Sequence, residues 1–305
     1  MKLVTYEAGD NVSIGLYRGG IIYDLNKSYE SVFEERGGFP KDMLSLIECG
    51  EDSLERVRQL DKSLGEWGDK LKAAGYTYGE AEVHLLAPVP RPKKNIVCLG
   101  VNYAEHAEET GHELPRFPVF FTKPPTVIIG PYDLIHLPTC SSQIDYEGEL
   151  AFVFGKKGKN IGREDALDYV AGYTVMNDVT ARDLQSNHHQ WFKGKGLDTF
   201  GPMGPYFVTK EEVPDPHGLR LRTWLNGKIM QDSTTRNMIF KIPALISSLS
   251  MDMTVEPGDI VSTGTPSGVG HSRKPPVYLK AGDLVEVEVE GVGGLRNKVT
   301  STRGP

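Results

Sequence analysis

The stretch QIDYEGELAFV, residues 143–153, places Glu147 and Glu149 two positions apart in a segment that otherwise resembles a β-strand. Successive side chains of a strand point to opposite faces, so the two glutamates share one face with Ala151 and Val153. The opposite face carries only apolar side chains: Tyr146, Leu150, Phe152 and Phe154. On a solvated face the glutamates would merely aid solubility. In a cavity, two like charges at this spacing need a cation between them.

The composition excludes several classes of protein. The chain has 305 residues, 39% of them hydrophobic and 25% charged, which is ordinary for a globular protein with a full core. A net charge of −7 argues against a nucleic-acid-binding surface. No apolar stretch approaches the roughly 20 residues of a membrane span. We therefore expect a protein that binds neither nucleic acid nor membrane.

The cysteines and the amino terminus indicate a reducing compartment. Three cysteines lie far apart without a CxxC pair, so neither a disulfide framework nor a zinc site is indicated. The first residues, MKLVTYEAGDNVSIGLY, alternate like a strand and lack the apolar block of a signal peptide. We expect a cytoplasmic location.

The pattern along the chain predicts a mixed, β-rich fold in two parts. Short strands are expected at residues 2–6, 12–17 and 20–24, followed by helices. One helix carries an apolar stripe of core type: Leu54, Val57, Leu60, Leu64, Trp67 and Leu71. The proline-rich, basic segment APVPRPKK is the best candidate boundary. We expect a small α+β amino-terminal domain at 1–86 and a second domain at 87–305.

The second part of the chain has the character of short strands joined by tight turns. RTWLNGKIMQ, residues 222–231, carries Asn-Gly between two strand-like runs, a strong signal for a type I′ hairpin. LVEVEVEGVGGLRNKV, residues 284–299, predicts another hairpin. The glycine-rich stretch TGTPSGVG lacks the Lys-Ser/Thr of a phosphate-binding loop, and we interpret it as a tight turn that brings Thr265 near a ligand.

A third carboxylate can join the glutamate pair. GYTVMNDVTARDLQ, residues 172–185, predicts a second strand that ends at Asp178. Three carboxylates from two adjacent strands form a hard-oxygen site that suits Mg²⁺ or Mn²⁺ and does not suit zinc. The spacing alone makes this a hypothesis, since most Glu-x-Glu pairs in strands are solvated.

A histidine and a glutamate are expected on one helix face. In CLGVNYAEHAEETG, Asn102 can cap a short helix with Glu105 in the capping-box position. His106 and Glu109 are three residues apart, so their side chains share a face. A carboxylate bonded to an imidazole fixes its tautomer and makes it a water-activating base. The alternative is a surface helix on which the histidine has no chemical role. Taken alone, this stretch favours that alternative.

Three lysines lie within or directly after apolar or glycine-rich stretches. Lys123 comes directly after the strand-like VFF, and Lys193 and Lys195 lie in WFKGKGLDTFGPMGP. Beside a metal, a lysine can stabilise an oxyanion or bind a carboxylate, whereas a loop lysine is usually only solvated.

In order along the chain, these stretches resemble the fumarylacetoacetate hydrolase family. The matching motifs are NYAEHAEE, FFTKP, DYEGELA, NDVTARDLQ, KGLDTFGPMGP, LNGKIMQDS, TGTPSGVG and PPVYLKAGDLVEVEVEGVGGLRN. The resemblance covers residues from about 88 to 300. It implies a catalytic domain of rolled, mixed β-structure that usually forms homodimers, behind a variable amino-terminal domain.

The resemblance also implies roles for individual residues. Glu147, Glu149 and Asp178 match the metal ligands of the family, normally with Mg²⁺ or Mn²⁺. His106 and Glu109 match the dyad of the smaller acylpyruvate-cleaving members. Lys123 and Lys195 match lysines near the metal and substrate, with Lys195 chosen over Lys193 by its spacing to DTFGP. Gln185, Thr199 and Thr265 match substrate-contacting positions.

The function expected from this set is divalent-metal-dependent hydrolysis of a C–C bond in a 3-acylpyruvate, through a metal-stabilised enolate. Oxaloacetate decarboxylation and isomerisation or hydration of 2-oxo-dienoates are alternatives at the same site. A non-catalytic metal or 2-oxo-acid binder is a further alternative. Arg116 and Arg236 could pair with a distal carboxylate of the substrate; otherwise both are surface arginines.

Overall fold

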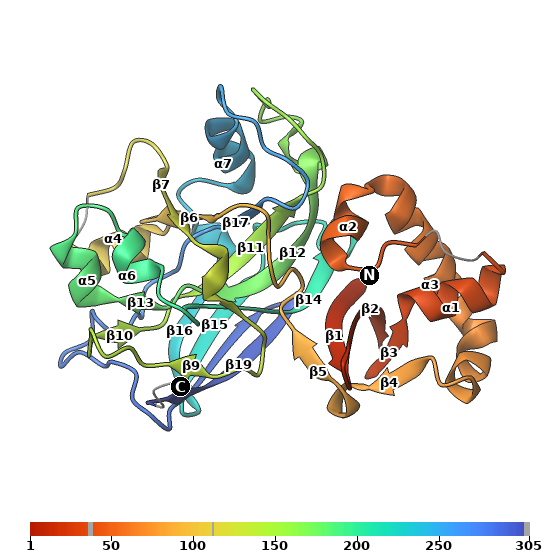
Figure 1. Cartoon of the computed structure of the whole chain (residues 1–305). Helices are drawn as coiled ribbons and strands as arrows, with labels where there is room; N and C mark the ends of the chain where they lie inside the picture. Colours follow the sequence, from red (N-terminus) through yellow and green to blue (C-terminus); the bar gives the residue numbers. More distant parts are fainter. Residues whose placement is uncertain (36–38, 112, 302–305) are drawn as a thin grey trace.

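A computed structural model describes residues 1–35, 39–111 and 113–301. Its amino-terminal part combines a small antiparallel sheet with helices (Figure 1). The elements are β1 (Lys2–Ala8), β2 (Asn11–Arg18), β3 (Ile21–Asp24), α1 (Leu25–Phe33), α2 (Met43–Glu48), α3 (Glu51–Ala73), β4 (Thr77–Gly79), the 3₁₀ turn η1 (Glu80–Glu82) and β5 (His84–Leu86). The three strands expected at the start of the chain are all present.

Helix α3 forms where the apolar stripe predicts it. Leu54, Val57, Leu60, Leu64 and Leu71 are buried on one face. Acidic residues occupy its first turn and lysines its last turn, as the helix dipole favours. The helix ends before a glycine in the left-handed conformation at position 75.

One twisted sheet passes from the amino-terminal part into the rest of the molecule. In the described chain it has 12 strands, with the path β4-β3-β2-β1-β14-β12-β11-β17-β6-β7; β5 pairs with β1 and β8 with β14. The strands not yet given are β6 (Ile96–Gly100), β7 (Val119–Lys123), β8 (Ile128–Ile129), β11 (Gly148–Phe154), β12 (Val170–Asn177), β14 (Gly201–Thr209) and β17 (Ile260–Ser262). Strand pairing between β1 and β14 crosses the expected boundary at residue 87, so the division into domains stays a prediction.

A second sheet packs against this one and closes the β-rich body (Figure 1). Its order is β16-β15-β18-β19-β9. The strands are β9 (Ile135–His136), β15 (Arg220–Leu225), β16 (Lys228–Thr234), β18 (Leu284–Val289) and β19 (Gly293–Thr300). Asn226 and Gly227 both have positive φ between β15 and β16, which confirms the type I′ hairpin. The hairpin of β18 and β19 is also confirmed.

The remaining elements are short. The helices are α4 (Ala104–Thr110), α5 (Arg182–Asn187), α6 (Phe192–Lys195) and α7 (Ile242–Leu249), and β10 (Ile144–Asp145) pairs with β13 (Thr180–Ala181). The 3₁₀ turns are η2 (Pro125–Val127), η3 (Ala166–Tyr169), η4 (Lys210–Glu212) and η5 (Thr235–Asn237). In the described part of the chain, no helix is long and apolar enough to cross a membrane.

The decisive stretch forms two strands where the sequence predicts one. β10 ends at Asp145 and β11 begins at Gly148. The intervening amides bond to side chains: Tyr146 N donates to Asp145 Oδ1 at 2.9 Å, and Glu147 N donates to Asn177 Oδ1 at 3.0 Å. These N–H groups are therefore withdrawn from strand pairing. Every residue of β11 is buried, which places this strand in the centre of the sheet.

Candidate active site

Strands β11 and β12 bring three carboxylates together. The two strands are antiparallel neighbours, and Asp178 N donates to Glu147 O at 2.8 Å just beyond their last pair. One oxygen from each of Glu147, Glu149 and Asp178 lies within 4.8 Å of the others. Glu147 is 5% exposed and Glu149 is 1% exposed. The glutamates therefore do not form a solvated strand face.

Two buried lysines neutralise part of this charge. Lys195 Nζ donates to Glu147 Oε2 and to Asp178 Oδ2, both at 2.7 Å. Lys123 Nζ donates to Asp178 Oδ1 and, at 3.0 Å, to the Val179 carbonyl. Both lysines predicted from the sequence thus lie against the carboxylates, whereas Lys193 is exposed.

An arginine and a fourth carboxylate complete the buried cluster, and sequence reasoning missed both. Arg182 Nη1 lies 2.6 Å from Glu147 Oε1, and Arg182 Nε donates to Asp145 Oδ2 at 2.9 Å. Asp145 ends β10 and Arg182 follows β13, so their contact depends on the pairing of these two strands. Both residues lie in motifs already quoted from the sequence, Asp145 in DYEGELA and Arg182 in NDVTARDLQ.

The cluster is electrostatically unbalanced at Glu149. Although burial opposes ionisation of Glu147, Lys195 and Arg182 hold its pKa well below the usual range. Burial raises the pKa of Glu149, and the charges of Asp178 and Glu147 raise it further. Glu149 instead accepts hydrogen bonds from the Ser262 hydroxyl and from Gly264 N. Four buried carboxylates thus face three buried cations, Lys123, Lys195 and Arg182.

This donor set fits a divalent cation. Three carboxylates with one oxygen each at close range supply hard ligands, and Mg²⁺ or Mn²⁺ prefers such ligands. Carboxylate oxygens have two lone pairs, so an oxygen that accepts a bond from a lysine can still bind a metal. A cation at this position would offset the excess negative charge that raises the pKa of Glu149.

Helix α4 presents His106 to the same region. The helix begins after Tyr103, so the expected capping box is wrong. Asn102 instead donates to the Thr263 carbonyl at 2.7 Å and accepts from Phe240 N at 2.8 Å, and Glu105 accepts from the Ser233 hydroxyl. Tertiary contacts therefore take both side chains that a local cap would have used.

His106 and Glu109 face each other without a hydrogen bond. His106 Nδ1 lies 3.8 Å from Glu109 Oε2, within ion-pair range. Both oxygens of Glu109 accept from Gly268 N, at 2.9 and 3.0 Å. Burial opposes ionisation of Glu109, but His106 and this backbone N–H lower its pKa. Glu109 thus fastens α4 to the turn at 263–270 and sets an anion beside the imidazole.

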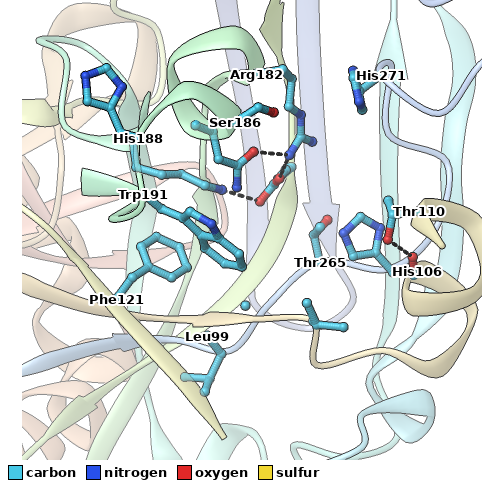
Figure 2. Close-up of a pocket in the computed structure, with 15 residues that line it drawn as sticks. Leu99, His106, Thr110, Phe121, Arg182, Ser186, His188, Trp191, Thr265 and His271 are labelled. Atoms are coloured by element: carbon cyan, nitrogen blue, oxygen red, sulfur yellow. Dashed lines mark hydrogen bonds and ion pairs between the residues drawn. The ribbon is translucent and has the colours of Figure 1, made fainter. Parts of the chain in front are cut away.

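A cavity of about 290 Å³ adjoins the cluster and is lined in part by His106, Glu147, Arg182 and Lys195 (Figure 2). Its lining residues do not include Glu109, Lys123, Glu149 or Asp178. Of the residues predicted from the sequence, five line it: His106, Glu147, Gln185, Lys195 and Thr265. Apolar walls come from Leu99, Phe121 and Trp191. His188 and His271, which are not among the predicted site residues, also line the cavity.

Two of the lining residues make hydrogen bonds to neighbouring residues through their side-chain oxygens. Gln185 Oε1 accepts from Arg182 Nη1 at 3.1 Å. Thr265 Oγ1 donates to the Gly148 carbonyl at 2.9 Å and accepts from Gln231 Nε2 at 2.7 Å. Thr265 therefore ties the 263–270 turn to β11 and offers a ligand only its remaining lone pair.

Three other predicted substrate residues lie outside the set that lines the cavity. Thr199 has a φ of 67°, and its hydroxyl accepts from His136 N at 3.0 Å. Arg116 and Arg236 are both exposed. Roles for these three residues in substrate binding stay predictions.

Comparison with known proteins places this site in a family. Residues 95–300 match the family described as fumarylacetoacetate (FAA) hydrolase C-terminal. The chain belongs to the fumarylacetoacetate hydrolase family. It is 43% identical to "Oxaloacetate tautomerase YisK" of Bacillus subtilis, over 98% of this chain and 100% of that protein. It is 42% identical to "Oxaloacetate tautomerase fahd2, mitochondrial" of Xenopus laevis, over 98% of this chain and 90% of that protein.

Solved structures of this family confirm the fold class expected from the sequence. Fumarylacetoacetate hydrolase from Exiguobacterium antarcticum superposes with a TM-score of 0.80 at 35% identity, covering 99% of this chain and 100% of that one. Maleylpyruvate hydrolase from Sphingobium gives a TM-score of 0.75 at 30% identity, covering 98% and 99%. The β-rich body and the α+β amino-terminal part therefore match along their whole length.

Proposed function

We propose that this protein is a divalent-metal-dependent enzyme that interconverts the keto and enol forms of oxaloacetate. The observation that carries the proposal is the buried group of Glu147, Glu149 and Asp178 with Lys195 beside it, of which Glu147 and Lys195 line the cavity. The choice of reaction is supported by relatives 42–44% identical over nearly the whole chain that are named oxaloacetate tautomerases. Their names favour this reaction over the acylpyruvate hydrolysis expected from the sequence.

Glu147, Glu149 and Asp178 would hold Mg²⁺ or Mn²⁺. When bound, the ion would act as a Lewis acid for the 2-oxo-carboxylate end of the substrate and stabilise negative charge on its 2-oxygen. Lys195 Nζ, already between Glu147 and Asp178, adds a positive charge next to that oxygen. The buried cluster therefore favours substrates that pass through an enolate.

In the keto-to-enol direction a proton leaves C3 and the 2-oxygen gains one; the reverse direction returns a proton to C3 and removes one from the 2-oxygen, and no bond to water forms in either. His106 lies in the cavity wall and can carry the proton to and from C3. Glu109, 3.8 Å from the imidazole, stabilises the protonated ring. Leu99, Phe121 and Trp191 limit access of water to the enolate.

Hydrolysis of 3-acylpyruvates is a second candidate. The His106–Glu109 pair favours it over oxaloacetate decarboxylation, because attack by water needs a base whereas metal-assisted decarboxylation largely does not. The likeness to the structure named maleylpyruvate hydrolase supports the same reaction. Oxaloacetate decarboxylation and 2-oxo-dienoate isomerisation share the enolate and belong in any substrate panel.

The test is a panel of oxaloacetate, acetylpyruvate, fumarylpyruvate and a 2-oxo-dienoate, each with Mg²⁺, Mn²⁺ or a chelator. With metal, we expect rapid loss of the absorbance of the oxaloacetate enol, and with chelator we expect no activity. Pyruvate should form no faster than it does from oxaloacetate without the protein. Cleavage of the acylpyruvates without any effect on the oxaloacetate enol would instead establish the hydrolase. Activity unchanged by the chelator would contradict both reactions as proposed.

A homodimer and a cytoplasmic location are further parts of this proposal. The family resemblance supports the dimer, and sedimentation of the purified chain tests it. For location, the vertebrate relatives are named mitochondrial, while the name of the Bacillus subtilis relative carries no compartment. Fractionation of the source cells decides this point.

A further inference from the structure

The cavity has a buried end and an open end. Glu147 and Lys195 at the buried end are 5% and 1% exposed, and they mark the place for the 2-oxo-acid group. His271 lines the same cavity and is exposed, so it stands at the mouth (Figure 2). A four-carbon dicarboxylate bound by its 2-oxo-acid end would direct its second carboxylate away from the buried cluster.

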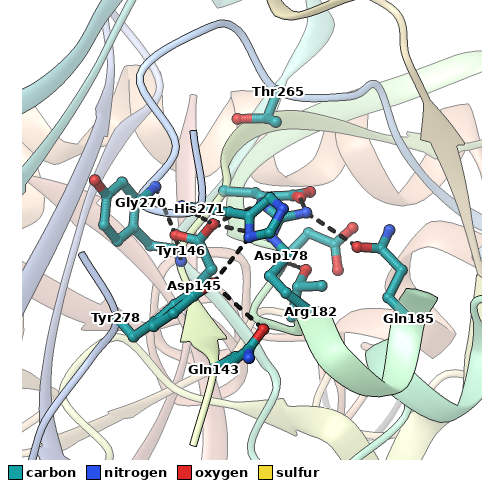
Figure 3. Close-up of polar contacts among 12 residues, drawn as sticks. Gln143, Asp145, Tyr146, Asp178, Arg182, Gln185, Thr265, Gly270, His271 and Tyr278 are labelled. Carbon is teal, nitrogen blue, oxygen red and sulfur yellow. Dashed lines mark hydrogen bonds and ion pairs between the residues drawn. The ribbon is translucent and has the colours of Figure 1, made fainter. Parts of the chain in front are cut away.

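The backbone holds His271 firmly in this position. Asp145 Oδ2 accepts from His271 N and from Arg182 Nε, both at 2.9 Å, and Asp145 Oδ1 accepts from Gly270 N at 2.8 Å. The same fully buried carboxylate therefore fixes Arg182 and the 270–271 backbone on one wall (Figure 3).

The Tyr278 hydroxyl orients the imidazole of His271. Its Nδ1 lies 2.9 Å from the Tyr278 hydroxyl, and that hydroxyl lies 3.3 Å from Gln143 Oε1 (Figure 3). The segment carrying Tyr278 is itself anchored to β10, since Leu279 N donates to the Ile144 carbonyl at 2.8 Å. Among the described residues no hydrogen bond to His271 Nε2 is found, so this atom is available to a ligand.

The partner of Nδ1 distinguishes His271 from the other histidines of the cavity. His188 Nδ1 lies 2.8 Å from the Leu184 carbonyl, which can only accept, so Nδ1 carries the proton and Nε2 of the neutral ring carries none. The Tyr278 hydroxyl can donate its single hydrogen to His271 Nδ1, at 2.9 Å, and its 3.3 Å contact with Gln143 Oε1 is then not a hydrogen bond. Nε2 of His271 can therefore carry a proton and donate to a carboxylate while the ring stays neutral. His106 is committed to its position beside Glu109.

We propose that His271, oriented by Tyr278, recognises the distal carboxylate of the substrate and selects dicarboxylic over monocarboxylic 2-oxo acids. This inference rests on the proposed function for the identity of the substrate. It assigns to His271 the role that the sequence suggested for Arg116 and Arg236, neither of which lines the cavity.

Two substrates isolate the distal group. Oxaloacetate and acetylpyruvate share the 2-oxo-acid end and both enolise, but acetylpyruvate carries a methyl ketone in place of the second carboxylate. With Mg²⁺ present, we expect His271→Leu to raise KM for oxaloacetate about tenfold and to leave kcat within about twofold, because one hydrogen bond to a charged group at an open cavity mouth is lost. For acetylpyruvate, KM should change less than about twofold.

Two further variants separate recognition from structure. His271→Gln keeps an N–H donor and should restore most of the affinity, and Tyr278→Phe should give a loss of a few-fold. His189→Leu is the matched control and should behave as the wild type. This histidine is exposed and does not line the cavity.

An unchanged KM for oxaloacetate in His271→Leu, or an equal rise for both substrates, would overturn the inference. If the wild type does not turn over oxaloacetate, the proposed function fails, and the inference is then decided by calorimetric binding of the same two compounds to the Mg²⁺-loaded protein. Weaker binding of oxaloacetate alone in His271→Leu would support recognition by His271, and equal weakening of both would refute it.

Discussion

At the scale of single residues, Glu149 is the least satisfied charge of the site. Its pKa is raised by burial and by Asp178 and Glu147, whereas the pKa of Glu147 is lowered by Lys195 and Arg182 despite burial. Two carboxylates only two residues apart thus differ because only one of them contacts cations. A divalent cation would change that relation, which makes Glu149 the most sensitive position for testing the metal.

We expect Glu149→Gln to weaken Mg²⁺ binding about tenfold or more and to abolish most activity. In the chelator-treated protein the same change should raise the free energy of unfolding by about 1 kcal/mol, since the amide oxygen still accepts from Ser262 and Gly264 while the buried negative charge is removed. Isothermal titration and thermal melting measure the two effects. A metal-free variant less stable than the wild type would contradict this view.

The effect should depend on pH with a definite sign. Folded Glu149 binds its proton more tightly than the unfolded chain does, so its contribution to the free energy of unfolding declines as pH rises above the ordinary value of 4.5. The stability advantage of Glu149→Gln over the metal-free wild type should therefore grow from pH 5 to pH 8. Melting curves across that range, with chelator present, measure it; a constant difference would show that Glu149 carries no such penalty.

Glu109 combines two roles that substitution can separate. Glu109→Gln retains an oxygen for Gly268 N but loses the charge beside His106, so kcat should fall about tenfold with little change in stability. Glu109→Ala also frees α4 from the turn and should cost about a further 1 kcal/mol of unfolding free energy. Steady-state kinetics and chemical denaturation test both variants. Wild-type kcat in Glu109→Gln would remove the carboxylate from the mechanism.

Individual site carboxylates were predictable where the reason is local. Glu147 and Glu149 share a face because strand side chains alternate, and Asp178 follows from the end of the next strand. Arg182 and Asp145 could not be found in this way, because their contact arises when β10 pairs with β13. His271 reaches the cavity through a turn whose path no local pattern specifies.

At the scale of elements, the turn at residues 263–270 connects α4, β11 and β16. Gly264 N contacts Glu149, Gly268 N contacts Glu109, and Thr265 bonds to Gly148 and Gln231. This turn was expected to bring Thr265 near a ligand, and Thr265 does line the cavity. The strands and hairpins were predictable from alternation and Asn-Gly, whereas the α4 cap was not, since Asn102 bonds to distant backbone instead.

The turn should tolerate no side chain at Gly268. A Cβ at Gly268 would lie 2.1 Å from the Met230 carbonyl oxygen, at a φ of +99°. We expect Gly268→Ala to cost about 2 kcal/mol or more and to lower activity by displacing Glu109. Gly282→Ala is the matched control, with a φ of +92° and no atom within 4 Å of its Cβ, and should cost only about 1 kcal/mol. Equal losses in denaturant titrations would mean that the close packing is unimportant.

At the scale of the whole molecule, the amino-terminal strand is part of the main sheet. β1 pairs with β14, and β14 pairs with β12, the strand that leads to Asp178. The sequence predicted a boundary near residue 87 from composition, but composition does not reveal which strands become neighbours. The order of the strands in the sheet could be predicted only through the family resemblance.

A chain that begins at residue 87 should therefore fold poorly. Removal of β1 leaves the edge of β14 without its partner, and an open strand edge promotes aggregation. The full chain should unfold in one transition by calorimetry, and the truncated chain should be less soluble and melt at a lower temperature. Two well-separated transitions in the full chain would instead indicate independent domains.

The most direct test of the central claim is an anomalous-difference map from a crystal of this protein grown with Mn²⁺ and oxalate. We expect one strong peak per chain at about 2.0–2.3 Å from an oxygen of each of Glu147, Glu149 and Asp178, with oxalate completing the coordination. A map with no peak between these three side chains, or with the metal bound elsewhere, would contradict the proposed enolate chemistry.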